Sequence, residues 1–302
     1  MTRKVNLLPL VILILCSCNQ SKTSIGIFDN MVFVKEGEFT MGDVNGRGTE
    51  SEKPLHKVYL KSFYLNKYEV TVNEFSQFVK ETSYVTDAEK KDSSLAFYKG
   101  KWGKYKGINW RYDATGALRS EQEHNHPVVH VSWNDANSYC MWLSKKTGRK
   151  YHLPTEAEWE FAARNRGKKI DYGWGNGNPI GKNGGNVADE SLLKQTSDAK
   201  GWLNYNDGYA YTAPVGSYNP NELGLFDMTG NVWEWCSDWF GKEYYSNCPK
   251  DNPVGPEDGL VKSFRGGCWY SDQDYARIAF HNFGNSPDQS YGDFGFRVAM
   301  TP

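Results

Sequence analysis

Three segments of the chain place apolar residues at helical spacing behind a residue suited to begin a helix. The first begins after Thr71, the second after Ser132 and the third after Thr155. Each of these residues is followed three positions later by Glu or Asp, the pattern of a capping box. In such a box the hydroxyl and the acid satisfy two backbone N–H groups that the helix leaves free. We therefore expect three helices, the second of which ends at Gly148, because glycine readily adopts a left-handed conformation there.

Other segments alternate apolar and polar residues with the period of a strand. Residues 31–42 predict a hairpin with Gly37 at its turn. Residues 57–67 predict a further strand, and a last one is expected at residues 295–300. Residues 86–127 are charged and rich in glycine and aromatic residues, and they predict a long ordered insertion with little regular structure. A few helices beside many short strands make the expected fold α+β and rich in loops.

The first eighteen residues have the features of an export signal. A basic start precedes an almost wholly apolar stretch at residues 5–15. This stretch is too short to span a bilayer, which takes about 20 residues. It runs into Leu-Cys-Ser-Cys, which resembles the lipobox of bacterial lipoproteins with Cys18 as the lipid-bearing residue. We interpret residues 1–17 as a lipoprotein signal peptide and residues 18–30 as a lipid-anchored tether, with an ordinary signal peptide as the alternative.

The charge balance argues against one class of function. The chain has 35 Lys and Arg against 36 Asp and Glu, and removing the signal peptide leaves 33 basic residues against 36 acidic ones. Nucleic-acid-binding proteins normally carry a basic surplus or a basic stripe. We therefore expect no nucleic-acid partner.

The expected location is that of an exported lipoprotein, held to a membrane by its lipid anchor at the bacterial outer membrane or the periplasmic face.

Four cysteines lie beyond the predicted lipid-bearing residue: Cys140, Cys236, Cys248 and Cys268. Export permits disulfides. Cys236 and Cys248 are close in sequence, with a glycine and an Asn-Cys-Pro turn between or beside them, and they are the first candidate pair. Spacing alone does not establish a pairing. The chain has no CxxC, and its six histidines do not show the spacing of a zinc site.

Eight segments occur in the order typical of one protein family. They are MVFVKEGEFTMGD (31–43), NKYEVTVNEFSQFV (66–79), GINWR (107–111), HPVVHVSWNDA (126–136), LPTEAEWEFAAR (153–164), GLFDMTGNVWEWCSDW (224–239), RGGCW (265–269) and GFR (295–297). Together they resemble the formylglycine-generating-enzyme family, also called sulfatase-modifying factors. The resemblance implies one domain over residues 31–300 with that family's variant of the C-type-lectin-like fold, which is rich in loops and often binds calcium.

Residues 227–234 have the composition of a calcium-binding loop. Calcium takes about six to eight oxygen ligands from carboxylates, carbonyls and water, and this segment alternates acids with positions whose carbonyls could point inward. The resemblance implies two calcium sites, with Asp227, Gly230, Val232 and Glu234 at the first and Asn186, Val187, Asp207 and Tyr209 at the second. The alternative is a loop held by Trp233 and Trp235 with its acids in solvent.

The resemblance also implies an oxidase that uses copper and dioxygen to convert a sulfatase cysteine to formylglycine. That chemistry needs two cysteines after an Arg-Gly-Gly motif, because soft thiolates suit Cu(I). Counted from Arg265, Cys268 stands at the position of a serine in the family, and Ser271 and Ala276 stand at the two cysteine positions. Copper is therefore not expected. Cys268 is either a displaced catalytic thiol, with His281 or another cysteine beside it, or a small buried apolar residue.

Three functions stay open for this chain. The first is a binding or assembly component of the cell envelope with an envelope or secreted protein partner, a role known for lipoproteins with this domain in the Bacteroidetes. The second is a formylglycine-generating oxidase with a displaced site at Cys268. The third is another enzyme chemistry in the same cleft. The residues expected at that cleft are Arg265, Trp269, Ser271 and Arg297, with the arginines tying loops together.

Overall fold

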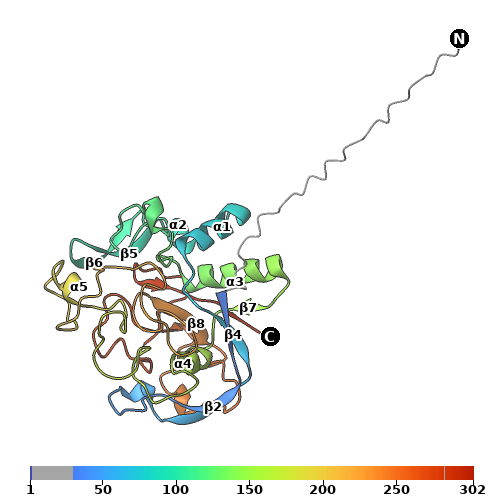
Figure 1. The fold of residues 1–302 in the computed structure, drawn as a ribbon, viewed down its shortest axis with the longest axis vertical. Helices are drawn as coiled ribbons and strands as arrows, with labels where there is room; N and C mark the ends of the chain where they lie inside the picture. The colour runs from blue at the N-terminus through green and yellow to red at the C-terminus, as the bar shows by residue number, and fades with distance from the viewer. Residues whose placement is uncertain (2–29, 282) are drawn as a thin grey trace.

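The computed structural model describes residues 30–281 and 283–302 together with Met1, and its largest sheet joins the two ends of the domain (Figure 1). The order in this sheet is β1-β4-β11-β7, and all three pairings are antiparallel. The four strands are Met31–Val34, Phe63–Asn66, Ala299–Met300 and Tyr151–His152, in that order. The strand predicted at residues 295–300 is therefore present as two short strands, and β11 is the second of them.

Three smaller sheets surround this one. Strand β8 (Trp233–Trp239) lies between β10 (Phe294–Gly295) and β9 (Lys262–Arg265), parallel to the former and antiparallel to the latter. The two remaining sheets are antiparallel pairs: β2 (Gly37–Met41) with β3 (His56–Leu60), and β5 (Ser93–Tyr98) with β6 (Lys101–Lys106).

The predicted hairpin over residues 31–42 is wrong. The segment does form two strands, but β1 pairs with β4 and β2 pairs with β3. Both partners come from residues 56–66, so the alternating pattern there belongs to two strands. Where the chain passes from β1 to β2, the backbone N–H of Glu36 donates to the Ser62 hydroxyl at 3.0 Å, which ties the two connections together.

The three predicted helices are confirmed as α1 (Val72–Thr82), α3 (Trp133–Thr147) and α4 (Glu156–Ala163). Each begins with a complete capping box at the predicted residue. Gly148 ends α3 with φ of 72°, in the left-handed region. The other helices are short: α2 (Asp87–Lys90), α5 (Glu190–Leu193) and the 3-10 turns Glu50–Glu52, Glu121–Glu123 and Tyr244–Asn247.

The insertion over residues 86–127 has more regular structure than predicted, because it contains α2 and the β5–β6 hairpin. The lysines of this hairpin are exposed, whereas Phe97 and Trp102 turn inward. The Trp102 ring stacks on Trp269 with centroids 5.7 Å apart, and Phe97 packs against Trp269 and Tyr270. The hairpin therefore becomes one wall of the region that follows the Arg-Gly-Gly motif.

Aromatic side chains fill the space between helices and sheets. Phe75 and Phe78 of α1 pack against Tyr139 of α3, and Phe75 also contacts Phe296 beside the final strands. A second part of the core lies around Trp159 of α4, which is fully buried. The few helices, short antiparallel strands and long connections confirm the α+β, loop-rich architecture.

Residues 2–17 of the predicted signal peptide (1–17), the predicted lipid-bearing Cys18 and residues 19–29 of the tether lie outside the described residues. Among the helices that the structure describes, none combines the length and the apolar character needed to cross a bilayer.

The candidate disulfide between Cys236 and Cys248 is not formed, and both thiols are free. Cys236 lies on β8 with its side chain fully buried in the core. Cys248 follows the Tyr244–Asn247 turn, where its thiol donates to the carbonyl of Pro249 at 3.5 Å. The chain between them leaves β8 for the surface, so closeness in sequence does not bring the two sulfur atoms together.

A buried histidine makes the stability of this fold depend on pH. His130 is fully buried, with Ser94 Oγ 2.9 Å from Nδ1 and the Asp113 carbonyl 2.7 Å from Nε2. Burial lowers the pKa of His130 to about 4 from its usual 6.5. A lowered histidine pKa stabilises the fold above the unfolded value, and that stability is lost as pH falls from 6.5 through 4. We expect the His130 contribution to the free energy of unfolding to fall by about 2 kcal/mol between pH 7 and pH 4.5.

The measurement is urea unfolding at the two pH values, in the natural chain and in His130→Asn. Asparagine tolerates the positive φ of 58° at this position. The variant should be less stable at pH 7 but should lose about 2 kcal/mol less on acidification. His124→Asn, at an exposed position, is the matched control and should leave the pH dependence unchanged. Equal acid sensitivity in the natural chain and in His130→Asn would contradict the assignment.

Candidate functional site

The turn after β9 places Cys268 in the interior. Gly266 and Gly267 have φ of 100° and 74°, a region that side chains rarely adopt. A Cβ atom on Gly267 would meet the backbone of Ala276 at 2.9 Å, so glycine is needed for the close approach of the two segments. The chain then turns back on itself, and the backbone N–H of Cys268 donates to Ser271 Oγ at 2.9 Å.

Cys268 is surrounded by polar partners although it is almost fully buried. Its sulfur lies 3.5 Å from Asp293 Oδ2 and 3.6 Å from Ser271 Oγ, and it accepts from the backbone N–H of Tyr270 at 3.4 Å. Burial, with the nearby Asp293 carboxylate, raises the pKa of Cys268 well above its usual range. The thiol is therefore protonated at neutral pH, and a thiol in this state is a weak nucleophile.

Neither of the two positions that hold cysteine in a copper-binding relative can supply a thiolate here. Ser271 is buried and accepts from the Cys268 backbone, and Ala276 is fully buried with no donor atom. The residues considered as a second metal ligand beside Cys268 lie elsewhere in the fold. His281 bonds Glu156 at 2.7 Å and stacks on Tyr245, and Cys236 sits on β8. In the described part of the chain, no three His, Cys, Asp or Glu residues are grouped as a metal site. The residues present do not fit copper.

Two adjoining hollows open beside Cys268. The larger one, of about 430 Å³, is lined by Asp198, Lys200, Trp233, Cys268, Tyr270, Ser271, Asp272, Tyr275, Phe283 and Asp293. The smaller one, of about 250 Å³, is lined by Leu95, Trp102, Trp233, Phe283, Asn285, Tyr291, Asp293 and Phe294. They share Trp233, Phe283 and Asp293, and we call the two together the Asp293 groove. Cavities of roughly 300–1,000 Å³ with aromatic walls and a few polar groups are typical of ligand sites.

The other three residues expected at the cleft lie beneath it. Arg265, Trp269 and Arg297 are fully buried and line neither hollow of the groove. Arg265 bonds Glu156 and Glu160 of α4 at 2.8 and 3.1 Å. These contacts tie strand β9 to helix α4, which positions the Arg-Gly-Gly turn rather than contacting a ligand.

The second predicted calcium site brings together two segments of the chain, residues 186–189 and 207–209. Asp207 accepts from the backbone N–H groups of Val187 and Tyr209 at 3.0 and 2.7 Å. Asn186 donates through its amide nitrogen, and its Oδ1 is buried with no hydrogen-bond partner among the described residues. Burial and the neighbouring Asp189 raise the pKa of Asp207 to about 8. An unpartnered amide oxygen and two neighbouring carboxylates are groups that a cation would stabilise, so these residues fit calcium.

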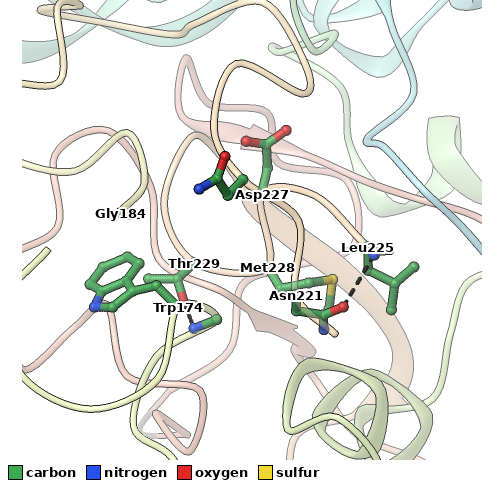
Figure 2. A pocket seen from close by; sticks show the side chains of 9 residues that line it. Trp174, Gly184, Asn221, Leu225, Asp227, Met228 and Thr229 are labelled. Carbon is green, nitrogen blue, oxygen red and sulfur yellow. Dashed lines mark hydrogen bonds between the residues drawn. The ribbon is translucent and has the colours of Figure 1, made fainter. Parts of the chain in front are cut away.

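The first predicted calcium site is more tightly packed. Arg297 binds both oxygens of Glu234 at 2.6 Å, and Trp159 Nε1 donates to the same carboxylate at 2.8 Å. Burial raises the pKa of Asp227 to about 6. Figure 2 shows the Asp227 carboxylate turned away from Trp174 beside a hollow of only about 10 Å³, which has room for roughly one water molecule. The hollow is therefore no substrate pocket.

Glu69, which the sequence reasoning missed, completes this acidic group. It is fully buried, its Oε1 accepts from the Asn231 amide at 2.9 Å, and its Oε2 has no partner among the described residues. Burial and the Asp227 carboxylate raise the pKa of Glu69 well above its usual range. Arg297 already engages both oxygens of Glu234, so Glu69 and Asp227 are the two acids here whose charge a further cation would neutralise. Gly230 joins the two sites, because a Cβ atom there would collide with the Asn186 carbonyl.

These features describe a loop-rich α+β domain in which an Arg-Gly-Gly turn lies against two acidic loops lined by oxygen atoms. The chain belongs to the sulfatase-modifying factor enzyme 1-like domain family, which it matches over residues 19–302.

Relatives of known name cover most of the chain. The formylglycine-generating enzyme of Streptomyces coelicolor is 39% identical over 285 residues, which cover 87% of this chain and 86% of that enzyme. The inactive C-alpha-formylglycine-generating enzyme 2 of Bos taurus is 33% identical over 293 residues, which cover 89% of this chain and 87% of that protein. The structure of PvdO from Pseudomonas aeruginosa matches with a TM-score of 0.68 and 28% identity over 90% of this chain and 94% of that chain.

Proposed function

We propose that this protein is an exported, lipid-anchored member of the family that binds a segment of an envelope or secreted protein in the Asp293 groove and does not carry out copper-dependent cysteine oxidation. One observation carries the proposal. Ser271 and Ala276 occupy the two copper-ligand positions, and both are packed into structural contacts. Two thiolates cannot be replaced by a hydroxyl and a methyl group in a Cu(I) site, because hard or apolar groups bind this ion poorly.

The proposed anchor is the lipid on Cys18, and the proposed location is the bacterial outer membrane or the periplasmic face. The apolar stretch at residues 5–15 and the Leu-Cys-Ser-Cys segment support export with lipidation. A lipid-anchored domain with a surface groove suits the capture of a partner at the membrane better than turnover of a diffusing substrate.

We further propose that calcium is a structural cofactor of the domain. Asn186, Val187, Asp207 and Tyr209 would hold one ion, through side-chain oxygens of the first and third and carbonyl oxygens of the other two. Asp227 with the missed Glu69 would hold a second, beside the carbonyls of Gly230 and Val232. Bound calcium would neutralise buried carboxylates and fix the loops beneath the groove.

The experiment that tests the absence of oxidase chemistry uses a sulfatase-motif peptide with a cysteine. The purified protein is incubated with this peptide, Cu(I), dioxygen and a thiol reductant, with the Streptomyces coelicolor relative as a positive control. Mass spectrometry should show an unchanged peptide with this protein, and elemental analysis should find no bound copper. Formylglycine product that disappears in Cys268→Ala would overturn the proposal, because it would establish a displaced active site at that thiol.

A further inference from the structure

A second large cavity of the domain shares no lining residue with the Asp293 groove. Its volume is about 540 Å³, within the range of roughly 300–1,000 Å³ that is typical of ligand sites. The lining comes from four segments of the chain and consists of Asn30, Tyr68, Thr71, Asn73, Glu74, Gln77, Asn125 and Val215. We call this cavity the amide cleft, because half of these side chains are carboxamides.

Backbone hydrogen bonds hold the walls of the amide cleft together. Three of them, each 2.8–3.0 Å long, connect the four segments: the N–H of Lys67 donates to the carbonyl of Asn30, that of Asn73 to His124 and that of Val215 to Asn125. These bonds use main-chain groups alone. The cleft is therefore formed before a ligand arrives, and its side-chain carboxamides are not consumed in building it.

The carboxamides of the cleft are available to a ligand. Asn73, Gln77 and Asn125 are exposed. The side chains of Asn73 and Asn125 have no hydrogen bond to another described residue, and Gln77 uses only its amide nitrogen, which donates to Glu81 at 3.0 Å. A carboxamide offers two donors and an oxygen that accepts twice. The cleft thus presents donors and acceptors of hydrogen bonds side by side, which suits groups that both donate and accept.

Glu74 is the one charged residue among the described residues that line the cleft. Its Oε2 accepts from the Thr71 hydroxyl and the Thr71 N–H, both at 2.8 Å, as part of the capping box of α1. Its Oε1 has no partner among the described residues and is not a buried atom. An acid with no base beside it repels phosphates and carboxylates. The cleft therefore disfavours anions, while Oε1 remains an acceptor for a hydroxyl group.

The apolar part of the lining is small. It consists of Val215 and the ring of Tyr68, which stacks on Phe226 with centroids 4.9 Å apart and is thereby held in place. A peptide gains much of its affinity from apolar side chains in pockets, and this lining offers little surface for them. A sugar ring carries hydroxyl groups around its edge, each a donor and an acceptor, and small C–H faces. Its chemistry matches the lining.

We propose that the amide cleft binds a neutral carbohydrate, whose hydroxyl groups form hydrogen bonds with the carboxamides of Asn73, Gln77 and Asn125 and with Oε1 of Glu74. This site is separate from the Asp293 groove and goes beyond the proposed capture of a protein segment. The two activities stand or fall independently, because no residue belongs to both cavities.

The test applies the full-length protein to an array of neutral and acidic oligosaccharides and then titrates the tightest neutral binder by calorimetry. We expect neutral glycans to bind with an affinity that changes less than about twofold between about 50 mM and 500 mM salt, because no ion pair is formed. Asn73→Ala and Asn125→Ala should each weaken binding about five- to tenfold, since each removes neutral hydrogen bonds. Asn178→Ala, at an exposed carboxamide outside the cleft, is the matched control and should bind like the natural protein.

Competition experiments identify the form of the ligand. Inhibition by the free monosaccharide indicates a soluble sugar, whereas a requirement for the oligosaccharide indicates a sugar chain, and both agree with the proposal. Hexaglycine amide, which offers peptide groups without sugar hydroxyls, should not compete. Competition by this peptide would overturn the choice of a carbohydrate.

The remaining outcomes decide whether the site is correct. Asn73 is exposed in the first turn of α1, where alanine favours the helix. An unchanged unfolding temperature of Asn73→Ala therefore shows that weaker binding is not caused by misfolding. Binding of acidic glycans alone, or of no glycan, would overturn the proposal. Binding of a neutral glycan that survives both Asn73→Ala and Asn125→Ala would also overturn it, because the sugar would then bind outside the amide cleft.

Discussion

Replacing Arg265 with methionine is expected to lower the free energy of unfolding by about 3–5 kcal/mol, because it removes the arginine that Glu156 and Glu160 share in the core. The guanidinium is fully buried and donates to Glu156 and Glu160 of α4, to the Ile278 carbonyl at 2.8 Å and to the Tyr245 hydroxyl at 2.6 Å. Methionine fills much of the volume but makes none of these bonds. The effect should appear as a lower urea midpoint or as failure to accumulate folded protein.

An exposed ion pair provides the control for this prediction. Arg47 pairs with Asp171 at 3.3 Å, and 43% of the arginine side chain is exposed. Arg47→Met should therefore cost less than about 1 kcal/mol. A similarly small cost for Arg265→Met would contradict the structural role assigned to Arg265 and would reopen a role for this residue in ligand binding.

Calcium removal is expected to lower the unfolding temperature by roughly 10 °C, if calcium is present at about 1,000 times its dissociation constant. The reason is the group of buried carboxylates, in which Asp207 and Asp189 lie side by side and Glu69 has a free oxygen. Without a cation these groups must take up protons or repel each other. Differential scanning calorimetry in calcium and in a chelator measures the difference.

The matched variants locate the effect. Asp207→Asn should remove the part of the stabilisation that comes from the Asp207 site, whereas Glu257→Gln, at an exposed acid, should leave the stabilisation intact. Magnesium should not replace calcium, because it demands a smaller and more regular shell of ligands. Identical unfolding temperatures in calcium and in chelator would contradict the assignment of calcium at both loops.

The sequence predicts the local elements of this fold better than their partners. Helices α1, α3 and α4 begin where predicted because a capping box is made by residues within four positions of each other. The hairpin over residues 31–42 is wrong for the opposite reason. Alternation indicates that a strand has one buried face, but its partner is chosen by packing across the whole domain. Residues 86–127 similarly conceal a hairpin, because Lys104 and Lys106 follow Trp102 on the same face of β6 and interrupt the alternation of apolar and polar residues.

The sequence predicts only the part of the candidate site that belongs to the Arg-Gly-Gly motif. The Arg-Gly-Gly segment locates Cys268 and shows that the copper ligands are absent. Asp293 lies 25 positions further along, and nothing in its local sequence indicates that it meets the Cys268 thiol. Glu69 stands within a recognised segment, yet its burial beside Asp227 depends on loops that are more than a hundred residues away. An unpartnered oxygen on Asp293 or Glu69 can be recognised only in the folded structure, which shows the neighbours of each carboxylate.

The central sheet has a consequence for synthesis. Leu65 of β4 pairs with Val32 of β1 on one side and with Ala299 of β11 on the other. A nascent chain therefore cannot complete this sheet until β11 has left the ribosome. Until then β4 presents an open edge, which other chains could pair with. Pairing between segments so far apart in the sequence forms slowly, because the long loop between them must close first.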